Sequence, residues 1–200
     1  MSIQPDKEAL EHFEVHVVAP LGGRLNQHWL VESRGERHVL RRWSQPIEDA
    51  SYEIRLLASL AALGWPVAPA VAGPVELEGQ VWSLAPFLPG DPPAERYSIG
   101  EQRQRGRLLA TFHADLTQLG GFGQRGKWRR CEETLADPTV DRLLSDHEKE
   151  RSEEVQILRW HLDRARERIA GLSPQNRPGM VIHGDFAPWN LLFVDGRLSG

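Results

Sequence analysis

The run Leu88-Pro89-Gly90-Asp91-Pro92-Pro93 divides this 200-residue chain into two parts with different hydrophobic patterns. A helix or a sheet ladder does not cross such a run easily, because proline lacks a backbone N–H and fixes its own φ. Short apolar runs typical of strands dominate before it, and longer amphipathic runs typical of helices dominate after it. The sequence therefore predicts an α+β protein with one boundary after residue 88.

Residues 1–88 read as a small sheet with one helix. The helix is expected over Ile47–Leu63, where apolar residues share a face and Gly64 and Pro66 end the pattern. The runs that predict strands are Phe13–Val18, Gln27–Glu32, Arg37–Trp43, Val75–Leu77 and Val81–Ala85.

Residues 89–200 read mainly as helices. Ser98 and Glu101 form a capping-box pattern ahead of one amphipathic helix, and a second helix is expected over Ser152–Ala170. The intervening Gly121–Glu150 is expected to be irregular. Its basic cluster is interpreted as a solvated surface, because the chain as a whole is acidic; the cluster consists of Arg125, Lys127, Arg129 and Arg130.

The last segment returns to strand-like runs. Met180–Ile182 and Leu191–Val194 predict short strands, and Asp195-Gly196 predicts a two-residue hairpin turn. Because the returning strand is barely begun at Gly200, the pattern is typical of a truncated chain.

Composition excludes several classes of protein. A formal net charge of −4 gives no reason to expect nucleic-acid binding. There is no apolar run near the ~20 residues that span a bilayer, so a membrane protein is not expected. Cys131 is the single cysteine, which excludes an internal disulfide and favours a reducing cytoplasm.

The segment His183-Gly184-Asp185-Phe186-Ala187-Pro188-Trp189-Asn190 carries the most specific signal. Gly184 and Pro188 restrict a loop that follows a strand, so Asp185 and Asn190 can turn toward one point. A carboxylate can accept the proton of a substrate hydroxyl, and an amide oxygen is a hard ligand suited to Mg²⁺. A base and a metal ligand on one tight loop are what phosphoryl transfer requires.

The pattern H-G-D-x-x-x-x-N resembles the catalytic loop of the aminoglycoside phosphotransferase family, which includes homoserine and choline kinases and is related to the protein kinases. The resemblance implies a protein-kinase-like, two-lobed fold. Residues 1–88 would be a small, β-rich N-lobe, and residues 89–200 a partial, mostly helical C-lobe with its catalytic loop at 183–190. It also implies an ATP- and Mg²⁺-dependent kinase with a small-molecule hydroxyl acceptor, in which Asp185 is the base and Asn190 the metal ligand.

The same resemblance assigns the nucleotide site. The turn at Gly22 and Gly23 would meet the ATP phosphates through backbone N–H groups, although no G-x-G-x-x-G is present. Period-two alternation places Val39 and Arg41 on one strand face, where valine would pack on adenine and arginine would bind phosphate.

Two further parts of the nucleotide site follow from the family pattern. A helix acid should pair with the Arg41 cation; Glu53 is favoured, with Glu48 and Asp49 as alternatives. Backbone groups near Ala85–Phe87, at the expected hinge, would hydrogen-bond adenine.

The sequence departs from the family at its end, because members continue with a second metal-binding aspartate after the position of Gly200. The alternative interpretation is therefore a catalytically inactive, nucleotide-binding remnant or pseudokinase. A protein kinase is a third reading, disfavoured by the HGD form of the loop. The sequence specifies neither the acceptor nor the oligomeric state.

Overall fold

A computed structural model describes residues 4–23, 25–93, 98–123, 125–126, 131–171 and 184–200. The chain forms two compact units, unit 1 from Met1–Gly126 with Met180–Gly200, and unit 2 from Lys127–Gly179. This division falls at other positions than the lobe boundary expected after residue 88, so the extents of the two lobes remain a prediction.

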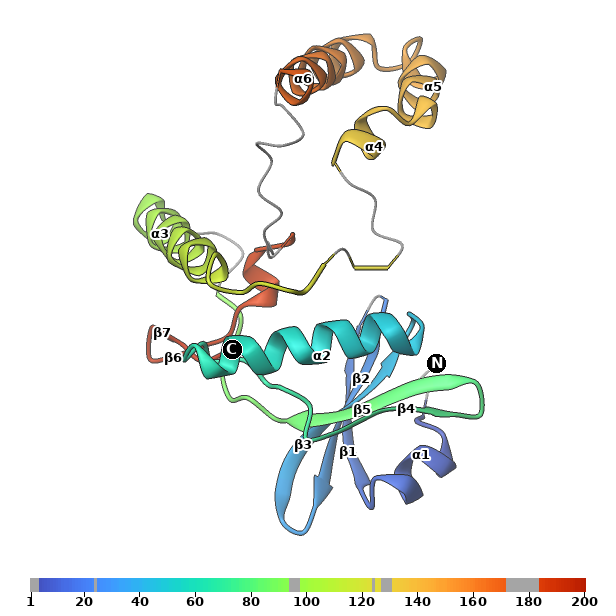
Figure 1. Cartoon of the computed structure of the whole chain (residues 1–200), viewed down its shortest axis with the longest axis vertical. Coiled ribbons are helices and arrows are strands. Elements are labelled where there is room, and N and C mark those ends of the chain that lie inside the picture. The colour runs from blue at the N-terminus through green and yellow to red at the C-terminus, as the bar shows by residue number, and fades with distance from the viewer. Residues whose placement is uncertain (1–3, 24, 94–97, 124, 127–130, 172–183) are drawn as a thin grey trace. The chain divides into compact units, whose positions relative to one another are not determined.

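Unit 1 is built on a five-stranded antiparallel sheet in the order β1-β2-β3-β5-β4 (Figure 1). Each predicted run of residues 1–88 corresponds to one of these strands. The first begins later than expected, because the turn that ends the short helix α1 (Lys7–His12) occupies residues 13–15. The strands are β1 (His16–Gly22), β2 (Gln27–Ser33), β3 (Glu36–Trp43), β4 (Ala72–Leu77) and β5 (Gln80–Pro86).

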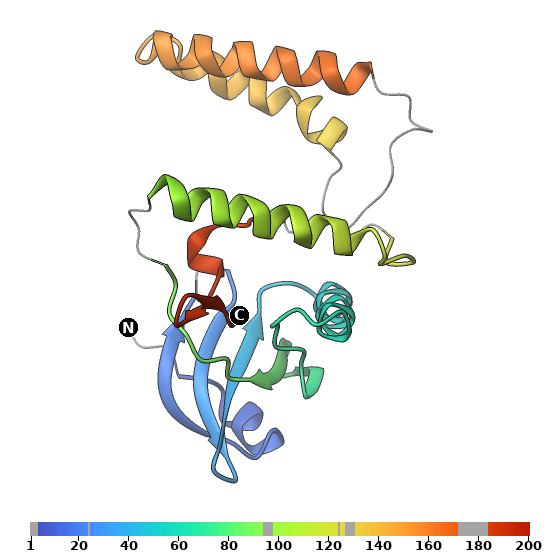
Figure 2. The same cartoon turned by 90° about the vertical axis from the view of Figure 1, so that its left-hand side faces the viewer.

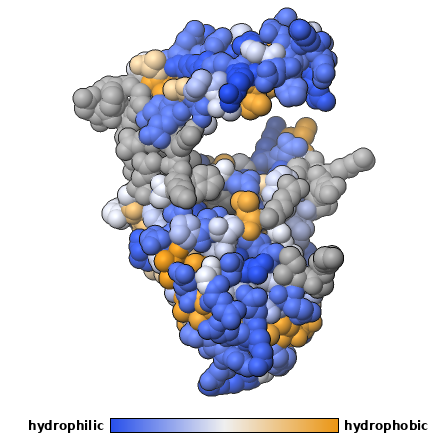
Figure 3. All heavy atoms as spheres, turned by 90° about the vertical axis from the view of Figure 1, so that its right-hand side faces the viewer, coloured by the Kyte–Doolittle hydropathy of each residue, from blue (hydrophilic) through white to orange (hydrophobic). Residues whose placement is uncertain are grey.

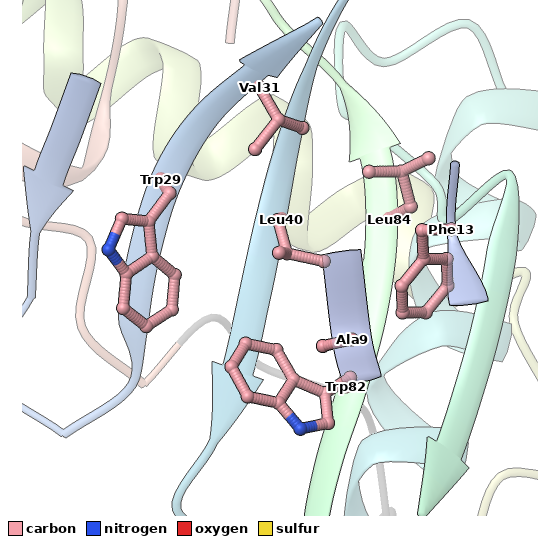
Figure 4. Close-up of a cluster of buried hydrophobic side chains, with 7 residues drawn as sticks. All are labelled: Ala9, Phe13, Trp29, Val31, Leu40, Trp82 and Leu84. Atoms are coloured by element: carbon pink, nitrogen blue, oxygen red, sulfur yellow. The ribbon is translucent and has the colours of Figure 1, made fainter. Parts of the chain in front are cut away.

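One face of the sheet forms the main apolar core, which helix α1 covers (Figure 4). Trp82 and Leu40 are fully buried there at 0% exposure, and the Trp29 and Trp82 rings lie 5.7 Å apart. Because side chains alternate along a strand, the burial of Leu40 sends its neighbours Val39 and Arg41 to the opposite face. The cluster comprises Ala9, Phe13, Trp29, Val31, Leu40, Trp82 and Leu84.

Helix α2 (Ile47–Ala62) packs on that opposite face, and its bounds match the predicted Ile47–Leu63 to within one residue at the C-terminal end. Trp43, Ala50 and Val81 form a second cluster between this helix and the sheet. The indole N–H of Trp43 donates to the hydroxyl of Ser83 at 2.9 Å. Helix α2 is thereby fixed beside the strand that carries Arg41.

Helix α3 (Ile99–Leu116) begins at the predicted capping box, in which Ser98 and Glu101 bond reciprocally. Its Phe112 is buried, stands edge-on to Trp65 at 4.8 Å, and lies 6.2 Å from the Phe186 ring. One aromatic side chain therefore links α3, the chain that follows α2, and the segment that contains Asp185.

The C-terminal part of unit 1 contains the 3₁₀ turn η2 (Pro188–Asn190) and the hairpin of β6 (Phe193–Val194) and β7 (Arg197–Leu198) (Figure 2). Both residues of the connecting Asp195-Gly196 turn have positive φ, as the predicted hairpin requires. The expected strand Met180–Ile182 lies outside the described residues. Phe193 bridges to Asp91, which anchors the hairpin to the proline-rich segment.

In its described part, residues 131–171, unit 2 contains three helices, α4 (Cys131–Leu135), α5 (Pro138–His147) and α6 (Ser152–Ala170). The last was predicted, but the expectation that residues 121–150 are irregular is wrong. Asp137 caps α5 by accepting from the Thr139 N–H at 2.8 Å, and Pro138 occupies its first turn. Arg166 of α6 binds the Asp141 carboxylate of α5 with two hydrogen bonds, of 3.1 and 2.7 Å.

The face of the molecule in Figure 3 is mainly hydrophilic, with small separate apolar patches. Among the described residues, none of the helices combines the length and apolar character needed to cross a bilayer.

Candidate active site

Asp185 and Asn190 come together on the loop that connects Gly184 to β6. The Asn190 side-chain amide donates to the Asp185 carbonyl at 2.9 Å and to the Asp185 carboxylate at 3.0 Å. Gly184 has a φ of 77°, and η2 folds the chain back so that the Asn190 N–H reaches the Ala187 carbonyl at 3.0 Å. His183 lies outside the described residues.

This geometry orients both side chains. Because Nδ2 of Asn190 faces Asp185, the Oδ1 atom of the same amide points away from that carboxylate. Both residues are exposed, so a substrate can reach them. The loop therefore presents a carboxylate and, directed away from it, an amide oxygen, the two kinds of group that proton transfer and hard-cation binding need.

Arg41 and Glu53 form an ion pair of 2.8 Å between β3 and α2. Of the three acids considered from sequence, Glu53 is the partner of Arg41, whereas Glu48 is exposed and Asp49 is buried at 5% exposure. The Arg41 guanidinium also stacks 3.6 Å from the centroid of the Trp43 ring. A helix acid and an aromatic ring thus hold this cation against the sheet.

Arg125 is a member of the site that sequence reasoning missed. It binds the second carboxylate oxygen of Glu53 at 3.0 Å, and its side chain is only 22% exposed. The interpretation of Arg125 as part of a solvated surface is therefore wrong. The other members of that cluster, Lys127, Arg129 and Arg130, lie outside the described residues. The contact joins positions 72 residues apart (125 − 53), and no local sequence pattern signals it.

The predicted glycine turn closes β1 at Gly22 and Gly23, with φ values of 80° and 128°. A Cβ on Gly23 would stand 1.9 Å from the Asn26 carbonyl oxygen, so only glycine fits there. The Nδ1 atom of His28 lies 3.2 Å from the Gly22 carbonyl, and His28 pairs directly with Arg41 across β2 and β3. The turn is thus tied to the strand face that carries the Arg41–Glu53 pair.

His28 should make folding stability depend on pH. Burial, and then the positive charge of Arg41, lower the pKa of this imidazole below its usual 6.5. The native chain therefore binds fewer protons than the unfolded chain as the pH falls through about 6.5. The free energy of unfolding should decrease as the pH is lowered through this range. We expect His28→Gln to flatten this loss, measured as urea midpoints between about pH 8 and pH 5.5. An unchanged pH dependence would contradict the assignment.

The expected adenine-contacting residues lie side by side on the sheet. Val39 pairs with Ala85 between β3 and β5, on the face opposite Leu40. The Phe87 N–H donates to the Arg37 carbonyl at 3.2 Å, which engages this amide with the neighbouring strand. Any contact of the Phe87 backbone with a base would therefore come from its carbonyl.

Three features define the protein-kinase-like class of folds. The chain has a five-stranded antiparallel sheet, a cation on β3 that forms an ion pair with a helix acid, and a later loop that joins an aspartate to an asparagine. Within that class the chain belongs to the phosphotransferase enzyme family, whose sequence model matches residues 16–200.

Two homoserine kinases are among its relatives. The one from Caulobacter sp. strain K31 is 31% identical over 183 residues, covering 87% of this chain and 54% of the relative. The one from Rhodospirillum rubrum is 32% identical over 184 residues, covering 86% of this chain and 52% of the relative. The chain thus spans about half the length of the kinases that it matches.

Solved structures of aminoglycoside-modifying enzymes share the fold. A thermostable variant of aminoglycoside phosphotransferase APH(4)-Ia, in complex with AMP-PNP and hygromycin B, aligns with a TM-score of 0.65 at 18% identity, over 96% of this chain and 68% of that one. Spectinomycin phosphotransferase APH(9)-Ia, in complex with ADP and spectinomycin, aligns with a TM-score of 0.55 at 12% identity, over 98% and 67%. The predicted family and fold class are therefore confirmed.

Proposed function

We propose that the protein is an ATP-dependent kinase that transfers the γ-phosphate to a hydroxyl group of a small molecule. The observation that carries the proposal is the contact of Asp185 with Asn190 at 3.0 Å, on the loop with the H-G-D-x-x-x-x-N pattern. Membership of the phosphotransferase enzyme family supports the reaction type.

In this proposal Asp185 orients the acceptor hydroxyl and accepts its proton as the oxygen attacks phosphorus. Its contact with Asn190 restricts the carboxylate to one position, so less orientational freedom is lost when the substrate binds. Because Asp185 is exposed, an acceptor hydroxyl can reach its carboxylate.

Mg²⁺ is the cofactor that this family implies, and the donor set fits an ion carried by the nucleotide. Among the described residues no three His, Cys, Asp or Glu side chains gather into a metal-binding group. The Oδ1 atom of Asn190 is a hard oxygen directed away from Asp185, and it would hold the ion together with phosphate oxygens. The bound ion would neutralise phosphate charge.

The nucleotide would lie on the sheet face that carries Val39, Arg41 and Ala85. Arg41 offers a guanidinium held by Glu53 at 2.8 Å, which can bind phosphate oxygens without losing side-chain freedom. The backbone at Gly22 and Gly23 approaches without side chains, so phosphate oxygens could reach its N–H groups. Arg here replaces the lysine that is frequent in kinases and keeps the positive charge.

Homoserine is the acceptor that we propose to test first, because relatives 31% and 32% identical are homoserine kinases. The solved structures that share the fold bind aminoglycoside-type antibiotics, but at identities of 18% and 12% they support the fold alone.

The test is transfer from γ-labelled ATP by the full-length protein, with homoserine, choline and aminoglycosides offered separately. We expect labelled product with one hydroxyl compound, homoserine above the others, and loss of transfer when Mg²⁺ is chelated. ATP binding with no transfer to any of these acceptors would contradict a kinase and favour the inactive nucleotide-binding alternative.

A further inference from the structure

Glu53 is shared by two arginines. Arg41 binds its Oε1 atom at 2.8 Å and Arg125 binds its Oε2 atom at 3.0 Å. All three side chains are only 22–23% exposed. One carboxylate therefore binds two guanidinium groups in a place with limited access to water.

The two guanidinium groups repel each other. Burial lowers the pKa of Arg41, Glu53 opposes this effect, and the positive charge of Arg125 lowers the pKa further. Like charges held this close destabilise one another, more so where water screens them poorly. A bound anion would relieve the repulsion of both cations at once.

The Arg41 guanidinium also has N–H donors that its contact with Glu53 does not use. A guanidinium has five N–H donors, and the hydrogen bond to Glu53 uses one nitrogen of Arg41. Its Nε atom is buried and has no hydrogen-bond partner in the described part of the chain. An acceptor with several oxygens, such as a phosphate chain, would suit this arrangement.

The residues on both sides of Arg125 contact helix α2, and these contacts place Arg125. The Tyr52 ring stands edge-on to Phe122 at 5.7 Å, and the Tyr52 hydroxyl donates to the Gly123 carbonyl at 3.4 Å. Gly126 packs so close to Asp49 that a Cβ would lie 2.1 Å from its carboxylate. Contacts on either side of Arg125 thus hold the chain along the helix that carries Glu53.

We propose that Arg125 is a second phosphate-binding cation of the nucleotide site, acting beside Arg41 on the polyphosphate of ATP. The inference rests on the proposed function, since it places the nucleotide at the Arg41–Glu53 pair. It predicts that Arg125 contributes to affinity for the phosphate chain and not to affinity for the nucleoside.

The test compares ATP and adenosine affinities by calorimetry for the full-length protein and three variants. Arg125→Gln keeps a donor for Glu53 but removes the charge, and should weaken ATP binding about tenfold or more. Adenosine affinity should change less than about twofold. Arg125→Lys keeps the charge and should retain more ATP affinity than Arg125→Gln. Arg55→Gln removes the same charge from an exposed position of α2 and should leave ATP affinity nearly unchanged.

Two results would overturn the inference. The first is ATP affinity of Arg125→Gln within about twofold of the wild type, with or without a lower melting temperature, because Arg125 would then only dock the chain. The second is an equal loss in Arg55→Gln, which would attribute the effect to the overall charge of the protein and not to the position of Arg125. Failure of the wild-type protein to bind ATP would instead contradict the proposed function itself.

Discussion

Asp185→Asn is expected to reduce phosphotransfer by the full-length protein about a hundredfold to ten-thousandfold, the range typical of losing a positioned general base. Asparagine has nearly the same shape as aspartate, and its amide oxygen can still accept from the Asn190 side chain, which lies 3.0 Å from the carboxylate. The loop should therefore keep its fold while losing the group that accepts a proton. We expect ATP affinity to stay within about twofold, measured by calorimetry alongside the transfer rate.

Asp195→Asn is a matched control for this variant. Asp195 lies on the β6–β7 turn with a φ of 48°, a conformation that asparagine adopts as readily as aspartate. The same substitution ten positions along the chain should leave the rate unchanged. Wild-type turnover in Asp185→Asn would reject the role proposed for Asp185, and equal losses in both variants would indicate a general effect on the hairpin.

Much of the N-terminal sheet could be predicted because its signals are local. Alternation along Arg37–Trp43 predicted that Val39 and Arg41 share a face, and burial of Leu40 at 0% exposure on the other face agrees. The capping box at Ser98 and the Asp195-Gly196 turn were predicted for the same reason, since each depends on a few neighbouring residues.

The missed helices had weaker or misread signals. Helix α1 has six residues, too few for a clear amphipathic period, and α4 has five. Helix α5 did carry a start signal, because Asp137-Pro138 is an N-cap followed by proline at the first turn. The region was nevertheless expected to be irregular, because its composition is polar.

The candidate site likewise has one part that could be predicted from the sequence and one part that could not. The pairing of Arg41 with Glu53 could be anticipated from the resemblance to the kinase family, with Glu48 and Asp49 as open alternatives, whereas strand alternation by itself only placed Arg41 on the face of Val39. The contact of Arg125 with Glu53 depends on how the chain beyond α3 returns to α2, and that return is set by tertiary contacts such as Tyr52 with Phe122. No pattern along the sequence encodes it.

Trp82→Ala is expected to lower the free energy of unfolding of unit 1 by about 3–5 kcal/mol, the usual cost of deleting a buried aromatic ring. Trp82 has 0% exposure, lies beside Trp29 at 5.7 Å, and is the largest fully buried side chain among the described residues. Its strand β5 pairs with β3, so loosening this core would also loosen the strand that holds Arg41. Urea denaturation followed by far-ultraviolet circular dichroism measures the loss.

Trp82→Phe separates the ring from its polar atom. Within the described residues the buried Trp82 indole N–H has no hydrogen-bond partner, so phenylalanine removes a donor that is costly to bury as well as some apolar volume. The two effects oppose, and we expect a net cost below about 2 kcal/mol, clearly less than for alanine. Trp189→Ala, at a side chain 70% exposed, should change stability by no more than about 0.5 kcal/mol. Equal losses in Trp82→Ala and Trp189→Ala would show that the apolar core between α1 and the sheet does not determine the stability of this unit.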